Sequence, residues 1–173
     1  MSLIKTTTTL IIFCLFITSL AYTKTAEDYF NSGYAKAELK KDYRGEIQDY
    51  TKAIELNPKD AEAYYNRGTA KAELKDYKGA RQDYTKAIKL NPKDFEAYTN
   101  RGVAKFELKK DYRGAIQDYT KAIELNPKDA EAYYNRGLTK ITSGQKDSGC
   151  LDLSKAGELG LAGAYEAIKK YCN

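Results

Sequence analysis

The stretch RGAIQDYTKAIELNPKDAEAYYNRG, from Arg113 to Gly137, decides the fold of this chain. The same letters occupy Arg44 to Gly68 with one change, since Glu46 stands where the later copy has Ala115. A third near-copy runs from Lys78 to Gly102. Copies that recur about every 34 to 35 residues predict an array of one supersecondary unit rather than a single irregular core. Repeat arrays present extended surfaces, so we expect function to reside in the residues that each copy places on one face.

Each copy has the pattern of two short helices joined by a turn. In residues 61–94, Asp60 is placed to cap the first helix and Asp76 begins the second. Asn91-Pro92 ends the second helix, because proline cannot continue the hydrogen-bond ladder. The apolar stripes at helical spacing are Tyr64, Gly68 and Ala72 on the first helix, and Ala80, Tyr84, Ala87 and Ile88 on the second. Neither stripe is wide enough to fold alone, so stacking of neighbouring units must complete the core.

This unit resembles the tetratricopeptide repeat (TPR), whose pattern places aromatic, glycine, small and proline residues at set spacings. The matching residues in two units are Tyr64, Gly68, Ala80, Tyr84, Ala87 and Pro92, and then Tyr98, Gly102, Ala115, Tyr119, Ala122 and Pro127. The resemblance implies an all-α fold, a right-handed superhelical TPR solenoid of helix-turn-helix repeats with a C-terminal capping helix. The first unit departs from the pattern at Glu46, which we expect to strain or expose that terminal repeat.

The repeat pattern divides the chain into seven segments. They are 1–21, a signal peptide; 22–25, a short linker; 26–60, TPR 1; 61–94, TPR 2; 95–129, TPR 3; 130–160, a divergent TPR 4; and 161–173, the capping helix. Lys41 and Lys110 are interpreted as single insertions in the turns between helices, which makes two units one residue longer.

The N-terminus has the pattern of a secretory signal peptide. Lys5 supplies a positive charge, residues 10–20 form a short apolar run, and small residues precede a predicted cleavage site before Tyr22. The run is shorter than the roughly 20 residues of a membrane-spanning helix. We therefore expect an exported protein, periplasmic or secreted; an uncleaved signal anchor that tethers it to the membrane is the alternative.

Removal of the signal peptide leaves two cysteines, Cys150 and Cys172. An even pair in an exported chain indicates a disulfide. Cys150 falls early on one predicted helix and Cys172 just past its antiparallel neighbour, so both reach the same end of the hairpin. We predict a Cys150–Cys172 disulfide that locks the cap, with two reduced thiols as the alternative.

The composition argues against catalysis. The chain has no histidine, which removes the commonest general base and the usual zinc ligand. Its carboxylates recur identically in each unit, as scaffold residues do, and its basic residues form no segregated stripe for nucleic acid. We therefore predict no catalytic residue, no metal, no cofactor and no nucleic-acid partner.

Two charged series recur in register on the paired helices. Matched repetition of both signs favours structural ion pairs between the helices, because a buried arginine must be paired. A cationic ladder for an acidic ligand is the alternative. The predicted ion-pair residues are Arg67, Arg101, Arg136, Asp49, Asp83, Asp118 and Asp152. Since Ser32 replaces arginine in the first unit, we expect Asp49 to pair with Arg67 across the repeat boundary.

One asparagine per unit recurs on the first helix. In TPR superhelices this position faces the concave groove, where an amide offers both a donor and an acceptor to a peptide backbone. Local backbone capping is the equally weighted alternative. The predicted groove residues are Asn31, Asn66, Asn100 and Asn135, with Phe30, Tyr65, Thr99 and Tyr134 and then Tyr34, Thr69, Val103 and Leu138 around them.

These residues predict a protein–protein interaction module that binds an extended peptide or partner helix as a scaffold or adaptor. The first turns of the groove helices carry Glu62, Glu96 and Glu131 and lack the lysines of the carboxylate clamp that TPRs use for acidic tails. The sequence therefore favours a neutral or basic partner segment. A self-assembling structural repeat protein is the alternative.

Overall fold

The structure is a computed structural model that describes residues 23–40, 42–109 and 111–173. Within these ranges the chain forms nine α-helices and no strand. The predicted signal peptide 1–21, with Cys14 inside it, lies outside the described residues, as do the insertions Lys41 and Lys110.

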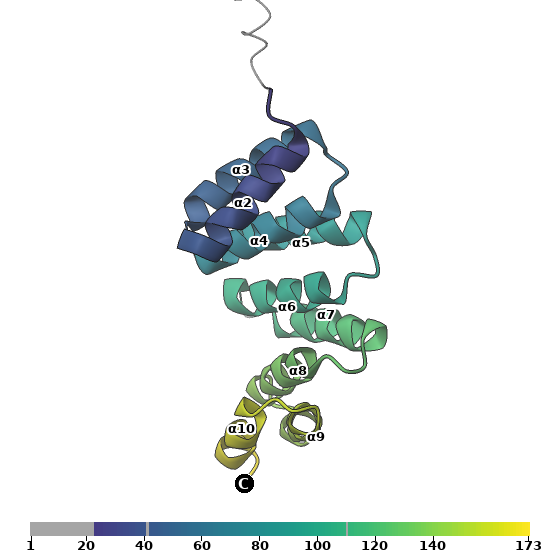
Figure 1. Ribbon diagram of the computed structural model, residues 1–173. Helices are drawn as coiled ribbons and strands as arrows, with labels where there is room; N and C mark the ends of the chain where they lie inside the picture. Colours follow the sequence, from purple (N-terminus) through teal and green to yellow (C-terminus); the bar gives the residue numbers. More distant parts are fainter. Residues whose placement is uncertain (1–22, 41, 110) are drawn as a thin grey trace, which may run out of the picture.

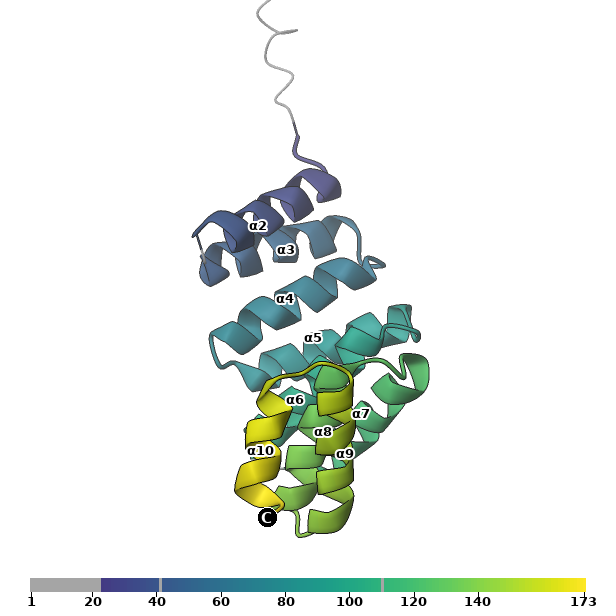
Figure 2. The ribbon, with the colours of Figure 1, turned by 60° about the horizontal axis from the view of Figure 1, so that its bottom comes forward.

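The helices pair into four antiparallel hairpins and a final single helix, which follow one another along one stack (Figures 1 and 2). The hairpins are α2 (Ala26–Lys40) with α3 (Tyr43–Leu56), α4 (Ala61–Glu73) with α5 (Tyr77–Leu90), α6 (Phe95–Lys109) with α7 (Tyr112–Leu125), and α8 (Ala130–Thr142) with α9 (Lys146–Glu158). The single helix α10 (Gly163–Tyr171) packs on α9. The all-α solenoid predicted from the sequence is confirmed.

Aspartate side chains begin most of these helices. Asp60, for example, accepts a hydrogen bond from the backbone N–H of Ala63 at 3.0 Å. This bond satisfies one of the N–H groups that the first turn leaves without a helical partner. Asp42, Asp76, Asp94, Asp111 and Asp129 make the same bond at their own helices. The repeated aspartates therefore fix where each helix starts.

A tyrosine of the second helix fills the core of each of the first three hairpins. Tyr50, Tyr84 and Tyr119 are almost fully buried. Each ring lies against a glycine of the first helix, and a Cβ added at Gly102 would come within 2.6 Å of the Tyr119 ring. Burial raises the pKa of Tyr84 to about 12, although its hydrogen bond to Thr69 acts in the opposite sense. The glycines are thus required by the close approach of the rings.

The fourth hairpin replaces this arrangement with closer helix packing. Leu153 is fully buried at the tyrosine position, and Gly149 stands where Ala115 stands in the third repeat. A Cβ at Gly137 would lie 2.8 Å from the carbonyl oxygen of Gly149, so the two backbones nearly touch. The smaller side chains therefore let α8 and α9 approach more closely.

Glu46 breaks the pattern in the first hairpin in an unexpected way. The expectation that it strains or exposes the repeat is corrected in part, because the side chain is only 4% exposed. Its Oε1 atom has no hydrogen-bond partner within the described chain. Burial, and then the charges of Asp42 and Glu73, raise the pKa of the Glu46 carboxyl. A carboxylate therefore occupies a site that holds alanine in the next two repeats.

The first helices of the hairpins line one side of the stack. Besides the contacts between consecutive helices, α4 contacts α6, and α6 contacts α8. This side carries the residues predicted to form the groove.

Candidate functional site

The two charged series form ion pairs inside each hairpin. Arg67 donates from Nε and Nη2 to the two carboxylate oxygens of Asp83, at 2.9 and 2.7 Å. Lys71 lies 2.7 Å from the same carboxylate. Arg101 with Lys105 holds Asp118 in the same way, and Arg136 with Lys140 holds Asp152. All three aspartates are buried, so these cations are engaged inside the protein.

Each arginine also reaches the preceding repeat. Arg67 donates from Nη1 to the hydroxyl of Thr51 at 3.1 Å, which links the second hairpin to the first. Arg101 and Arg136 make the same contact with Thr85 and Thr120. The expected pair between Asp49 and Arg67 is therefore corrected. Asp49 accepts from Ser32 and pairs with Lys36 of its own repeat.

The asparagine series is less uniform than the charged series. Asn31 is exposed, whereas Asn66, Asn100 and Asn135 are half-buried. Asn100 donates from Nδ2 to the Tyr65 hydroxyl at 3.0 Å, so its amide is oriented by the preceding repeat.

A first cavity of about 360 Å³ lies between α4 and α6. Thr69, Asn100 and Val103 of the predicted groove line it. Ala72, Glu73, Lys75, Tyr77, Tyr84 and Ala104 complete its wall, and sequence reasoning did not select them for the groove. The replacement of Thr69 by Val103 in the next repeat makes one side of this cavity apolar.

A second cavity of about 320 Å³ lies between α6 and α8. Tyr65, Thr99 and Asn100 of the predicted groove line it, together with Phe95. Its other walls are the carboxylates Glu96, Asp129 and Glu131. Within the described chain these three carboxylates form no ion pair, in contrast to the buried aspartates of the scaffold.

This second cavity is electronegative. Burial, and then the charge of Glu96, raise the pKa of the Tyr65 hydroxyl. Thr99 is 4% exposed and donates to Asp129 at 3.0 Å, so it forms the floor and not the rim. Tyr65 and Tyr134 occupy the equivalent position in the flanking repeats, and Thr99 is the smaller side chain.

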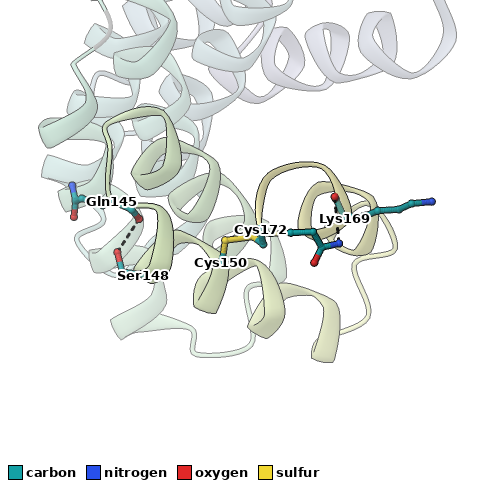
Figure 3. Close-up of a disulfide and its surroundings, with 6 residues drawn as sticks. Gln145, Ser148, Cys150, Lys169 and Cys172 are labelled. Carbon is teal, nitrogen blue, oxygen red and sulfur yellow. Dashed lines mark hydrogen bonds between the residues drawn. A yellow bond between two sulfur atoms is a disulfide. The ribbon is translucent and has the colours of Figure 1, made fainter.

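A third cavity of about 520 Å³ lies between α8 and α10. Tyr134 and Leu138 of the predicted groove line it from α8. Gly163, Glu166, Ala167, Lys169, Lys170 and Tyr171 line it from α10, and sequence reasoning did not select any of these. The cap is therefore one wall of this cavity. The predicted Cys150–Cys172 disulfide is present beside it, with an S–S distance of 2.00 Å (Figure 3).

The three cavities gather seven of the twelve predicted groove residues and leave five outside. Asn31, Phe30, Tyr34, Asn66 and Asn135 line none of the three. Phe30 instead packs edge-on against the buried Tyr50, with ring centroids 5.6 Å apart. Asp129 was not predicted as a groove residue, because an aspartate at the start of α8 is fully explained by helix capping. It also lines the second cavity.

The described residues contain no cluster of three or more His, Cys, Asp or Glu side chains placed to hold a metal ion. No helix in the same ranges is long and apolar enough to cross a membrane.

Three family models match the chain. A model described as TPR repeat matches residues 40–75 and 108–144, and two described as tetratricopeptide repeat match residues 61–94 and 83–117. Together the matches extend over more than half of the chain. No curated protein matches it.

Solved structures of similar fold cover most of the chain. A crystal structure of MamA protein is 28% identical, with a TM-score of 0.76, over 83% of this chain and 78% of that one. The Arabidopsis OM64 TPR domain is 33% identical, with a TM-score of 0.64, over 66% of this chain and 93% of that one. The first TPR of Spaghetti (RPAP3), bound to the HSP90 peptide SRMEEVD, is 29% identical, with a TM-score of 0.66, over 69% of this chain and 94% of that one.

Proposed function

Because the chain belongs to the tetratricopeptide repeat family, we propose that it is a non-catalytic module that binds an extended peptide or a partner helix in its concave groove. The single observation that carries the proposal is the row of cavities along the first helices, where α4, α6 and α8 face each other. A similar TPR structure holds a peptide, which supports a peptide as the class of ligand.

The division of charges supports the groove as the binding surface. The recurring arginines and lysines form ion pairs with buried aspartates, so these cations stabilise the stack. Asn100, by contrast, lines two cavities and keeps its amide oxygen available for a peptide N–H. Two residues that differ from their counterparts in the other copies, Thr99 and Val103, line these cavities beside recurring residues such as Asn100.

The partner segment that we propose is neutral or basic. Glu96, Asp129 and Glu131 surround one cavity without a cation of the described chain to neutralise them. Opposite charges across an interface steer association and exclude partners of the same charge. An acidic peptide such as the SRMEEVD bound by Spaghetti would be repelled from this part of the groove.

Selection from a random library of 12-residue peptides on the immobilised chain tests the proposal. We expect a set of peptides that compete with one another for one site. The variant with Asn66, Asn100 and Asn135 all changed to Ala should lose most of this binding while its far-ultraviolet circular dichroism is unchanged. Equal binding by the parent and the triple variant would contradict the groove as the site.

The charge of the partner is tested by Thr99→Tyr, which introduces the residue found at the equivalent positions of the flanking repeats, Tyr65 and Tyr134. The larger ring should fill the acidic cavity, and the selected peptides should lose their preference for Lys and Arg. Glu96→Gln with Glu131→Gln should do the same without altering the shape. Selection of acidic peptides by the parent chain would refute a neutral or basic partner.

We further propose that this scaffold or adaptor works in the cell envelope or outside the cell. The Cys150–Cys172 disulfide supports an oxidising compartment. Mass spectrometry of the protein isolated from its host should find a mature N-terminus at Tyr22. A chain that is full-length and confined to the cytoplasm would contradict export.

A further inference from the structure

The cavity between α8 and α10 differs from the two others because a helix outside the repeats supplies one wall. Tyr134 and Leu138 stand on the α8 side, and Ala167 and Tyr171 on the α10 side. These four side chains make the lining mainly apolar. The exposed residues Lys169 and Lys170 also line it, together with a single acidic residue, Glu166. The chemistry of the site suits a large apolar side chain that is followed by an acidic group.

This cavity continues the groove along one stripe of α8. Glu131, Tyr134 and Leu138 are spaced by three and four residues, so they share one face of the helix. Glu131 lines the acidic cavity, and the other two line the cavity beside α10. The separation from Glu131 to Leu138 is about 10 Å at 1.5 Å of rise per residue. An extended peptide crosses that distance in about three residues.

The position of α10 depends on few attachments. It is a nine-residue helix, and no side chain caps its N-terminus. Helices this short are marginal alone, so contacts with α9 must hold it. Ala164 and Ala167 are buried, and Tyr165 donates to the carbonyl oxygen of Gly157 at 3.2 Å. These contacts lie toward the α9–α10 turn.

The disulfide holds the other end of α10. Cys172 directly follows Tyr171, and its bond to Cys150 ties the end of α10 to the start of α9 (Figure 3). Lys169, Lys170 and Tyr171, which line the cavity, lie at this end. Without the disulfide this end of α10 would lose its covalent tie to α9, whereas the contacts near the turn would remain.

We infer that the cavity between α8 and α10 binds a large apolar side chain followed by an acidic group. In the same partner segment, this pair lies about three residues from the basic residue that the acidic cavity binds. The Cys150–Cys172 disulfide keeps the cavity between α8 and α10 formed. The inference rests on the proposed function of the groove. A dithiol such as dithiothreitol transfers two electrons and two protons to the disulfide, which breaks into two thiols while the dithiol becomes a cyclic disulfide.

The test uses peptides selected on the full, oxidised chain from the 12-residue library. They should contain a basic residue and, about three residues away, an apolar residue next to Asp or Glu. Fluorescence anisotropy of such a peptide should show at least a tenfold rise in Kd after dithiothreitol treatment of the chain. The Cys150→Ser, Cys172→Ser double variant should show the same rise, and dithiothreitol should not change it further.

A second peptide, with its apolar residue changed to alanine, separates loss of the cavity from general unfolding. It should bind the oxidised and the reduced chain equally and weakly, because it still uses the acidic cavity. Leu138→Thr, which copies Thr69 of the second repeat, should weaken only the first peptide. Lys169→Gln with Lys170→Gln should weaken binding of the acidic residue but not of its amide analogue.

Three results would overturn the inference. Equal affinity of the oxidised and reduced chains for the first peptide would show that the disulfide does not form the site. Selected peptides with a basic residue but no apolar–acidic pair would refute this cavity and leave the proposed function standing. Failure to select any peptide would overturn the proposed function and this inference together.

Discussion

The guanidinium of Arg101 donates two parallel hydrogen bonds to the carboxylate of Asp118, from Nε to Oδ2 at 2.8 Å and from Nη2 to Oδ1 at 2.7 Å. Lys105 approaches the same carboxylate to 2.8 Å, and the remaining nitrogen of Arg101 reaches Thr85 of the preceding hairpin. One arginine thus connects both helices of its own repeat to the repeat before it. The equivalent arginines do the same along the stack.

We expect Asp118→Ala to destabilise the protein strongly. It leaves Arg101 and Lys105 partly buried without their shared acceptor, and the loss of one partner of a buried ion pair costs about 3 kcal/mol. Denaturant unfolding followed by circular dichroism measures the loss. The matched control is Glu124→Ala, which removes an exposed i,i+3 partner of Lys121 and should cost under about 0.5 kcal/mol. Equal effects of the two changes would refute a structural role for the Asp118 network.

A pair of glycine substitutions tests the close approach of rings and helices. Gly102→Ala places a methyl group 2.6 Å from the buried Tyr119 ring and should cost about 1–3 kcal/mol by overpacking. Gly163→Ala meets nothing within 4 Å at the start of α10, so it should leave stability unchanged or raise it by up to about 1 kcal/mol. The two melting temperatures should therefore move apart, and a stable Gly102→Ala variant would contradict the packing described.

Glu46→Ala should stabilise the first repeat, although it removes a wild-type side chain. The buried Oε1 atom lacks a partner, and an unsatisfied buried polar group costs about 1–3 kcal/mol. The substitution also restores the residue found at Ala80 and Ala115, both fully buried. Thermal unfolding measures the gain, with Gln48→Ala on the exposed face of α3 as the control for helix propensity.

The gain from Glu46→Ala should depend on pH. The folded pKa of Glu46 is raised above its ordinary value of 4.5, so the folded protein binds this proton more tightly than the unfolded chain. The charged carboxylate therefore destabilises the fold at neutral pH, and the penalty disappears as the pH falls through the raised pKa toward 4.5. A difference between variant and parent that is constant from pH 7 to below 4.5 would contradict burial of the charge.

The repeat period predicts the hairpins well because the same physical signals recur in each copy. Asp at the helix start, Asn-Pro at the end of the second helix and a glycine opposite a tyrosine each act locally, so their structural outcome is read from spacing alone. Asp49 shows where this reasoning stops. Ser32 stands where the other units have arginine, and the Asp49 carboxylate forms its ion pair with Lys36 of its own hairpin rather than with Arg67 of the next. The choice depends on side-chain reach across packed helices, which spacing does not encode.

The predicted groove residues match the cavities less completely than the predicted helices match the fold. Of the asparagine series, Asn100 alone lines any of the three cavities described above, where its neighbours Thr99 and Val103 are smaller or less polar than in other copies. Whether these asparagines bind a partner stays a prediction. The α10 wall was not predicted because it comes from a segment outside the repeat pattern. Each of these cavities is lined by residues from more than one repeat or from α10, so its walls depend on how neighbouring units pack.

The disulfide gives the last prediction, which concerns stability rather than binding. Cys150 and Cys172 are separated by 22 residues, and closing a loop of this size stabilises a fold by about 3 kcal/mol in the chain-entropy account. In a stacked array each unit contacts only its neighbours, so the Cys150→Ser, Cys172→Ser variant should lose this stability locally. Amide hydrogen exchange should accelerate in α10, and to a smaller degree in α9, while α4 to α7 keep their protection. Uniform acceleration along the whole stack would mean that the cap controls global unfolding, and no acceleration in α10 would mean that its apolar contacts with α9 suffice without the disulfide.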